Sequence, residues 1–169
     1  MWRPAFLIAS CVNTNGCLMV GGSWLLLAED VAADDDDDDF SFFEEALDEL
    51  SVATTLVTVN DGVQLMDFLA DKSGNDLPDI LFLDLNMPGK NGFDVLAELK
   101  DSDKKNNIPI IIFSTSNEPG IIERCRSLGA NYFITKPILM RDIIQSIEHA
   151  LNIDWSKFDP NPKNFVYKG

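Results

Sequence analysis

The chain has 169 residues, 28 of them acidic and 13 basic, which gives a formal net charge of −15 at pH 7. An acidic surface repels a phosphate backbone, so we expect no direct binding of nucleic acid. The length fits one domain with extensions, and an apolar content of 46% is enough for an ordinary core.

The cysteines and the apolar runs bear on the compartment. Cys11, Cys17 and Cys125 are an odd number and do not form the pattern of a disulfide framework. A reducing compartment is the simpler interpretation, and no apolar run approaches the roughly 18 residues that span a bilayer. We therefore expect a cytoplasmic protein with no membrane partner.

Strand-like and helix-like patterns alternate along most of the chain. In chain order, the patterns predict strands over 24–28, 55–59, 80–83, 110–113 and 132–134, which alternate with helices over 40–50, 61–72, 91–100, 119–128 and 138–151. This alternation predicts an α/β domain over 24–153, with a doubly wound parallel sheet and helices on both faces. We interpret residues 1–23 as an N-terminal extension that is disordered or follows from a misassigned start codon. Residues 154–169 are expected to form a tail without a second domain.

Charged and hydroxyl residues lie at the carboxyl ends of four predicted strands. Glu29 and Asp30 follow the first strand, Asp84 the third, Ser114 the fourth and Lys136 the fifth. Ligands of open parallel sheets bind at this edge. Crowded carboxylates repel one another unless a cation lies between them, and their oxygens are suitable ligands for Mg²⁺. A carboxylate beside a metal ion and a lysine predicts phosphoryl transfer to the carboxylate.

Each of these residues also has an ordinary structural interpretation. Asp30 or Ser114 could cap the helix that follows it, Asp84 could begin a turn, and Lys136 could be a solvated loop residue. The position of all four at the same end of successive strands favours a common site.

Three segments resemble the response-regulator receiver domains, which are CheY-like. Residues 82–92 (FLDLNMPGKNG) look like the phosphoacceptor segment of that family, and residues 132–137 (YFITKP) are similar to its lysine-bearing segment. Residues 109–116 (PIIIFSTS) resemble its fourth strand. The resemblance covers about 24–153 and is nearest to the stand-alone, single-domain type. It implies a flavodoxin-like fold of five helices and five parallel strands in the order 2-1-3-4-5.

The resemblance implies a role for each residue around the phosphoacceptor. Asp84 would accept the phosphoryl group, and Lys136 and Ser114 would contact the phosphoryl oxygens. Ser114 and Phe133 would form the switch, in which the aromatic ring turns inward on activation. The bond between Lys136 and Pro137 would be cis.

The metal site is implied in the same way. Asp30 would bind Mg²⁺ directly, Glu29 mostly through water, and Asp84 and the backbone carbonyl of Asn86 would be further ligands. Residues 34–39 are six consecutive aspartates that the family pattern lacks. We interpret them as an insertion of roughly five residues that is extended and solvated, and we expect them not to form the metal site.

The resemblance also implies partners. The phosphoryl group would come from a sensor histidine kinase or a histidine phosphotransfer protein and would change binding to an unknown downstream protein. The face made by the fourth helix, fifth strand and fifth helix is a candidate partner or homodimer surface. The protein would not be an enzyme in the ordinary sense, although it would catalyse its own phosphorylation and dephosphorylation.

Two alternatives remain at this point. A degenerate receiver would act as a phosphate-independent interaction module, and a titration with Mg²⁺ would separate it from a working one. An aspartate-nucleophile phosphohydrolase would carry a second acid two residues after its nucleophile, on its first strand. Here that position is Asn86, and it follows the third strand.

Overall fold

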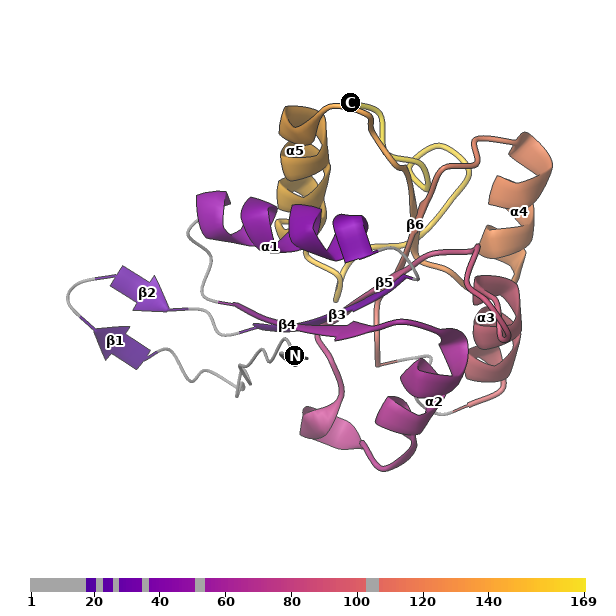
Figure 1. Ribbon diagram of the computed structural model, residues 1–169, viewed down its shortest axis with the longest axis horizontal. Coiled ribbons are helices and arrows are strands. Elements are labelled where there is room, and N and C mark those ends of the chain that lie inside the picture. The colour runs from indigo at the N-terminus through magenta and orange to yellow at the C-terminus, as the bar shows by residue number, and fades with distance from the viewer. Residues whose placement is uncertain (1–17, 21–22, 26–27, 35–36, 51–53, 103–106) are drawn as a thin grey trace.

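A five-stranded parallel sheet forms the centre of the protein (Figure 1). The computed structural model describes residues 18–20, 23–25, 28–34, 37–50, 54–102 and 107–169. The strands are β3 (Ala28–Ala33), β4 (Thr54–Val59), β5 (Ile80–Leu83), β6 (Ile110–Ser114) and β7 (Tyr132–Thr135). Their spatial order is β4-β3-β5-β6-β7. Numbered along the chain, this is 2-1-3-4-5, which confirms the predicted topology.

Five helices cover the two faces of the sheet. They are α1 (Asp37–Leu50), α2 (Gly62–Ala70), α3 (Gly92–Lys100), α4 (Pro119–Ser127) and α5 (Met140–Leu151). Figure 1 shows α1 and α5 on one face and α2, α3 and α4 on the other. A short 3₁₀ helix, η1 (Gly74–Asp76), precedes β5. Among the described residues, no helix is long and apolar enough to cross a membrane.

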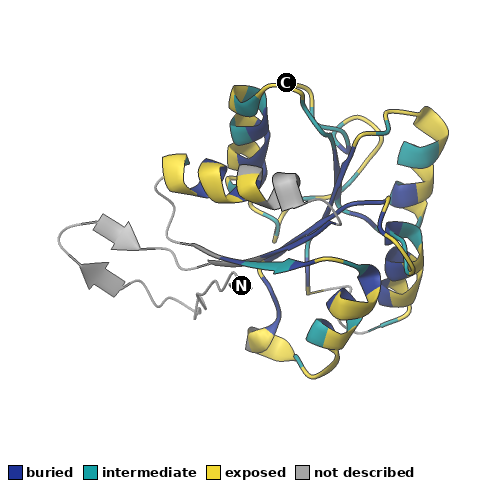
Figure 2. Ribbon diagram, in the orientation of Figure 1, coloured by how far each residue is buried: buried dark blue, intermediate teal, exposed yellow. Residues whose placement is uncertain are grey.

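Both faces of the strands are buried, as expected for a parallel sheet between helices (Figure 2). Alternate side chains of β6 enter opposite clusters: Ile110 and Ile112 belong to one, and Ile111 and Phe113 to the other. Phe43 fixes α1 on the second face, because its ring centroid lies 5.1 Å from that of Phe113 in an edge-to-face contact.

The start of the sheet differs from the prediction. The apolar run 24–28 is not its first strand: β2 (Ser23–Leu25) pairs with β1 (Leu18–Val20) in a separate antiparallel hairpin. The first strand of the main sheet is β3, which ends at Ala33. In its register with β5, Asp30 pairs with Ile80 and Ala33 pairs with Leu83. Asp30 therefore lies about 10 Å from the carboxyl end of the strand, at about 3.3 Å per residue.

The expected aspartate insertion is also wrong. Asp34 directly follows β3, and its amide donates to the Val59 carbonyl at 3.2 Å, so the pairing with β4 continues through it. Residues 37–39 are the first residues of α1, and residues 35–36 lie outside the described part of the chain. Helix α1 thus takes up half of the run, and β3 reaches the sheet edge with Asp34 directly after its last residue.

Candidate functional site

Asp84 lies at the centre of the carboxyl edge of the sheet. It follows β5, and its amide donates to the Ala33 carbonyl at 2.9 Å, which ties it to the end of β3. Its side chain is buried, and Oδ2 accepts a hydrogen bond from the Asn86 amide at 3.0 Å. Oδ1 is buried without a hydrogen-bond partner among the described residues. A buried carboxylate oxygen with an empty acceptor position indicates a place for a ligand.

Lys136 supplies the positive charge of the site. It follows β7, and its amide donates to the Ser114 carbonyl at 2.9 Å. Its Nζ lies 2.6 Å from Asp34 Oδ2 and 3.8 Å from Asp84 Oδ1. The lysine therefore bridges the ends of β3 and β5, and the three side chains form one cluster.

Asp34 occupies the place at which the sequence predicted Asp30. Only 4% of its surface is exposed, although an extended and solvated residue was expected there. Glu29 and Asp30 lie within the first half of β3, away from the carboxyl edge, so the structure does not bring them to Asp84. The physical reason is strand length: β3 runs on through Val31 and two alanines before its polar end.

Ser114 and Phe133 are both fully buried. The Ser114 hydroxyl is close enough to Asp84 to oppose the rise in its pKa. Even so, no described atom is placed to complete a well-formed hydrogen bond with Ser114 Oγ. Phe133 already points into the core, where its ring centroid lies 6.4 Å from that of Phe165. The site therefore has two buried oxygens, Ser114 Oγ and Asp84 Oδ1, for which the described part of the chain supplies no hydrogen-bond partner.

The pKa of Asp84 is raised above its ordinary value. Burial is the main cause, because it removes water from the carboxylate; the charge of Lys136 and the Asn86 amide oppose the rise but do not cancel it. The ionised carboxylate is thus left with less compensation than it has in water. Added positive charge at this position would stabilise it.

Two glycines that pack against the loop after β5 have no room for a side chain. A Cβ atom on Gly92 would lie 2.3 Å from the Asp84 carbonyl oxygen, and one on Gly62 would lie 2.4 Å from the Lys90 carbonyl oxygen. Gly89 has a φ of +69°, a value that side-chain-bearing residues seldom adopt. Close packing of α2 and α3 on this loop therefore fixes the backbone at Asp84.

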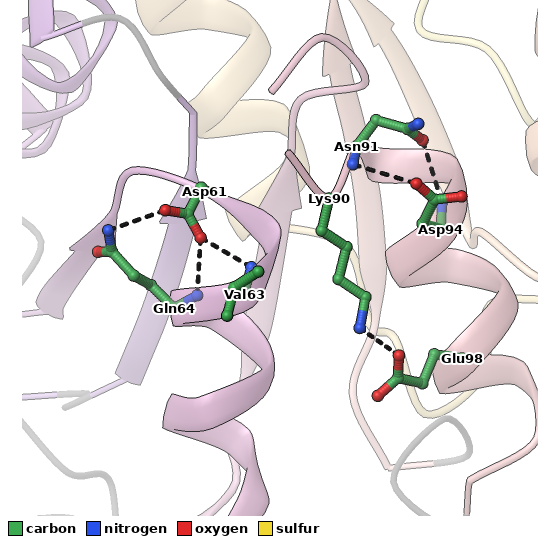
Figure 3. A network of polar contacts seen from close by, with 7 residues as sticks. All are labelled: Asp61, Val63, Gln64, Lys90, Asn91, Asp94 and Glu98. Atoms are coloured by element: carbon green, nitrogen blue, oxygen red, sulfur yellow. Dashed lines mark hydrogen bonds and ion pairs between the residues drawn. The ribbon is translucent and has the colours of Figure 1, made fainter. Parts of the chain in front are cut away.

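Side-chain contacts hold the same loop at its helix ends (Figure 3). Asn91 caps α3 by accepting from two amides of its first turn at 2.9 and 3.1 Å, and Asp94 accepts from the Asn91 amide. This reciprocal pair is a capping box. Lys90 forms an ion pair with Glu98, which lies eight residues further along the chain, in α3. Asp61 caps α2 through two amides, each at 2.8 Å.

The peptide bond between Lys136 and Pro137 is trans, and the described residues contain no cis peptide bond. The expected cis bond is therefore wrong. β7 nevertheless ends at Thr135, so Lys136 still lies directly after the strand end.

One signal for Asp34 was present in the sequence. Val31, Ala32 and Ala33 are a short apolar run, and an acidic residue follows it directly. Alanine has a low strand propensity, so the Trp-Leu run before it gives the stronger prediction of a strand. A strand that extends through Ala33 places Asp34 at the carboxyl edge of the sheet without any insertion.

Comparisons with known proteins identify the family. The family model for the response regulator receiver domain matches residues 31–148, more than half of the chain. Response regulator Rcp1 of Synechocystis sp. (strain ATCC 27184 / PCC 6803 / Kazusa) is 28% identical over 108 residues, covering 62% of this chain and 74% of Rcp1. The two-component response regulator ARR8 of Arabidopsis thaliana is 28% identical over 134 residues, covering 70% of this chain and 59% of ARR8.

A solved structure shows the same architecture. The crystal structure of the phosphorylated cyanobacterial phytochrome response regulator RcpA matches with a TM-score of 0.68 at 30% identity, covering 80% of this chain and 98% of RcpA. The resemblance to receiver domains is thus confirmed by the family model, by these relatives and by the fold. The chain belongs to the response regulator receiver domain family of two-component systems.

Proposed function

We propose that this protein is a phosphorylation-activated signalling switch that accepts a phosphoryl group on Asp84. One observation carries the proposal. The buried Oδ1 of Asp84 has no hydrogen-bond partner among the described residues, and it lies 3.8 Å from Lys136, which also contacts Asp34. The phosphorylated form of RcpA, which is 30% identical, supports the same chemistry. The donor would be a histidine kinase or a histidine phosphotransfer protein.

The residues at the edge fit a divalent cation, for which we propose Mg²⁺. Two buried carboxylates, from Asp34 and Asp84, lie beside Lys136, and oxygen is the ligand that Mg²⁺ prefers. The backbone carbonyl of Asn86 is a further proposed ligand. Asp34 replaces Glu29 and Asp30 in this set. When bound, the ion would neutralise charge on the phosphoryl oxygens.

The remaining groups have separate tasks in the transfer. An Asp84 oxygen attacks phosphorus as the bond to the donor nitrogen breaks. Lys136 compensates charge on the transferred group and can do so without moving far, because it already lies 3.8 Å from Asp84. The Ser114 hydroxyl donates to a phosphoryl oxygen and gains the partner that it lacks. The product is a phosphorylated protein, and slow hydrolysis at the same site reverses the change.

We propose that Ser114 and Phe133 transmit the phosphorylation of Asp84 to the partner surface. Movement of the hydroxyl toward the phosphoryl group would shift β6 relative to β7, which are paired at Ser114 and Thr135. A bias of a few kcal/mol is enough to exchange two such states. The face made by α4, β7 and α5 would then change toward a downstream protein or a second copy. If beryllofluoride shifts NMR signals only in the loops around Asp84, this part of the proposal fails.

The direct test is phosphoryl uptake. Acetyl phosphate with Mg²⁺ should add one phosphoryl group to the wild-type protein and none to Asp84→Asn. Asp67→Asn is the matched control, since Asp67 is exposed on α2, away from the sheet edge. Uptake by a folded Asp84→Asn variant would refute the assignment. A folded wild-type protein that takes up no phosphoryl group and binds no Mg²⁺ would instead be an interaction module.

A further inference from the structure

The outer edge of β7 carries a short added strand from the end of the chain. β7 is the last strand of the sheet, and its outer edge pairs with Val166 in a parallel bridge at Phe133. The Phe133 amide donates to the Phe165 carbonyl at 2.8 Å, and the Tyr167 amide donates to the Phe133 carbonyl at 2.9 Å. An open strand edge attracts other extended segments, and here the chain covers its own edge.

One side chain anchors this added strand. Phe165 is 1% exposed and is the only buried residue between 152 and 169. Its ring belongs to the main core cluster and contacts Phe133. The attachment therefore combines this buried ring and two backbone hydrogen bonds with packing by Val166 and by Tyr167, whose ring centroid lies 5.2 Å from that of His149. Backbone pairing with alternate side chains in contact is the way that sheet edges recognise extended peptides.

A turn directly before the added strand is held by hydrogen bonds within the tail. The Asn161 amide donates to Asn164 Oδ1 at 2.7 Å, and Asn164 Nδ2 donates to the Asp159 carbonyl at 3.0 Å. The Phe165 amide donates to the Asn161 carbonyl at 3.0 Å. These contacts lie within the tail, so they fix its shape without adding to its attachment to β7.

Charge also distinguishes this segment from the rest of the chain. Residues 160–169 contain Lys163 and Lys168 and no acidic residue, whereas the whole chain has a net charge of −15. A segment of opposite charge is attracted to an acidic domain and selected over acidic peptides. An external segment that replaced it would also need basic residues and no acidic ones.

We propose that the outer edge of β7, with the pocket that holds Phe165, is a docking site for an extended peptide flanked by basic residues. Residues 165–167 are its resident, displaceable occupant. The partner segment would run parallel to β7 and insert an aromatic ring beside Phe133. While the resident strand is in place, the site is closed to partners, because a tethered segment has an effective concentration on the order of millimolar.

The test uses full-length protein and two peptides. Phe165→Ala removes the anchoring ring, and Phe158→Ala is the matched control. Phe158 is a tail aromatic as well, but it contacts Trp155 and Tyr132 on the other face of the sheet. The probe is a synthetic peptide with the sequence of residues 160–169, and its control is the same peptide with the phenylalanine replaced by alanine.

The proposal predicts a specific pattern of binding and amide exchange. The phenylalanine peptide should bind Phe165→Ala at least about tenfold more tightly than wild-type protein or Phe158→Ala, in which the tethered strand competes. In Phe165→Ala, hydrogen exchange at the Phe133 amide should be faster, and the peptide should slow it again. Exchange at the Lys136 amide, which donates to β6, should not change.

Two outcomes would overturn the proposal. One is equal peptide binding to wild-type protein and Phe165→Ala; the other is no preference for the phenylalanine peptide by a folded variant. If Phe165→Ala does not fold, Asn164→Ala serves instead, since it removes the turn contacts and keeps every apolar side chain. It should show the same changes at smaller size, and unchanged Phe133 exchange together with unchanged peptide binding would refute the site.

Discussion

Replacing Asp34 by asparagine tests the structure most directly. The carboxylate of Asp34 pairs with Lys136 at 2.6 Å at the sheet edge, whereas Asp30 lies within β3. Asp34→Asn keeps the shape of the side chain and removes its charge. Asp30→Asn makes the same chemical change on the same strand and is the matched control. The two variants should differ in stability and in Mg²⁺ binding.

The expected loss of stability follows from the burial of the pair. The side chains of Lys136 and Asp34 are 11% and 6% exposed, so water screens their interaction poorly. Removing one partner of a buried ion pair costs about 3–5 kcal/mol. Lys136 keeps Asp84 at 3.8 Å, so we expect the lower end, about 3 kcal/mol. For a chain of this size that is a fall in Tm of about 6–12 °C. Asp30→Asn should change Tm by much less.

Mg²⁺ provides the second readout. At a concentration of about 100 times its Kd, a ligand raises the free energy of unfolding by about 2.7 kcal/mol. Wild-type protein and Asp30→Asn should gain this stability, and Asp34→Asn should lose most of it. Thermal unfolding with and without Mg²⁺, together with calorimetric titration, measures both effects. If Asp30→Asn loses Mg²⁺ binding and Asp34→Asn keeps it, the placement of the acidic pocket at the end of β3 is wrong.

Three further predictions concern single residues. Burial raises the pKa of Asp84, so the folded protein holds this proton more tightly than the unfolded chain, and stability falls as pH rises above the ordinary value of 3.8. Without Mg²⁺ at pH 7, Asp84→Asn should therefore raise Tm in thermal unfolding, and a lower Tm would contradict this sign. Gly92→Ala should lower the free energy of unfolding, measured by denaturant titration, by about 1–3 kcal/mol, because the added Cβ would meet the Asp84 carbonyl. Gly120→Ala has open space around the added Cβ and should leave the free energy of unfolding unchanged or raise it. Burial raises the pKa of Cys125 to about 11, so mass spectrometry should find this thiol unlabelled at pH 8 until the protein unfolds.

Local patterns were enough to predict most of the fold. The bounds of β5 agree with the prediction at both ends, because four apolar residues lie between polar neighbours. Asp84, Ser114 and Lys136 were placed at one edge because parallel strands bring their carboxyl ends together. None of these inferences needs a long-range contact, since strand ends can be read directly from the sequence.

The errors occurred where local signals compete or are absent. At β3, the Trp-Leu run is the stronger apolar signal, but it belongs to a separate hairpin, and the weaker Val-Ala-Ala run forms the strand end. Asp34 and Lys136 are 102 residues apart, so no local pattern reveals their contact. The docking of Phe165 on Phe133 likewise depends on a pocket that exists only after the sheet has formed.

The bridging position of Lys136 turns cation binding at this edge into an exchange reaction. Its ammonium group lies 2.6 Å from Asp34, so it already serves as an internal counter-ion there. A divalent ion that takes Asp34 Oδ2 as a ligand has to displace this ammonium, and the measured affinity is then the difference between the two interactions. The displaced ammonium remains tethered within reach of Asp84, at 3.8 Å in this structure. Loading the edge with a metal ion would therefore also release the lysine for the second carboxylate.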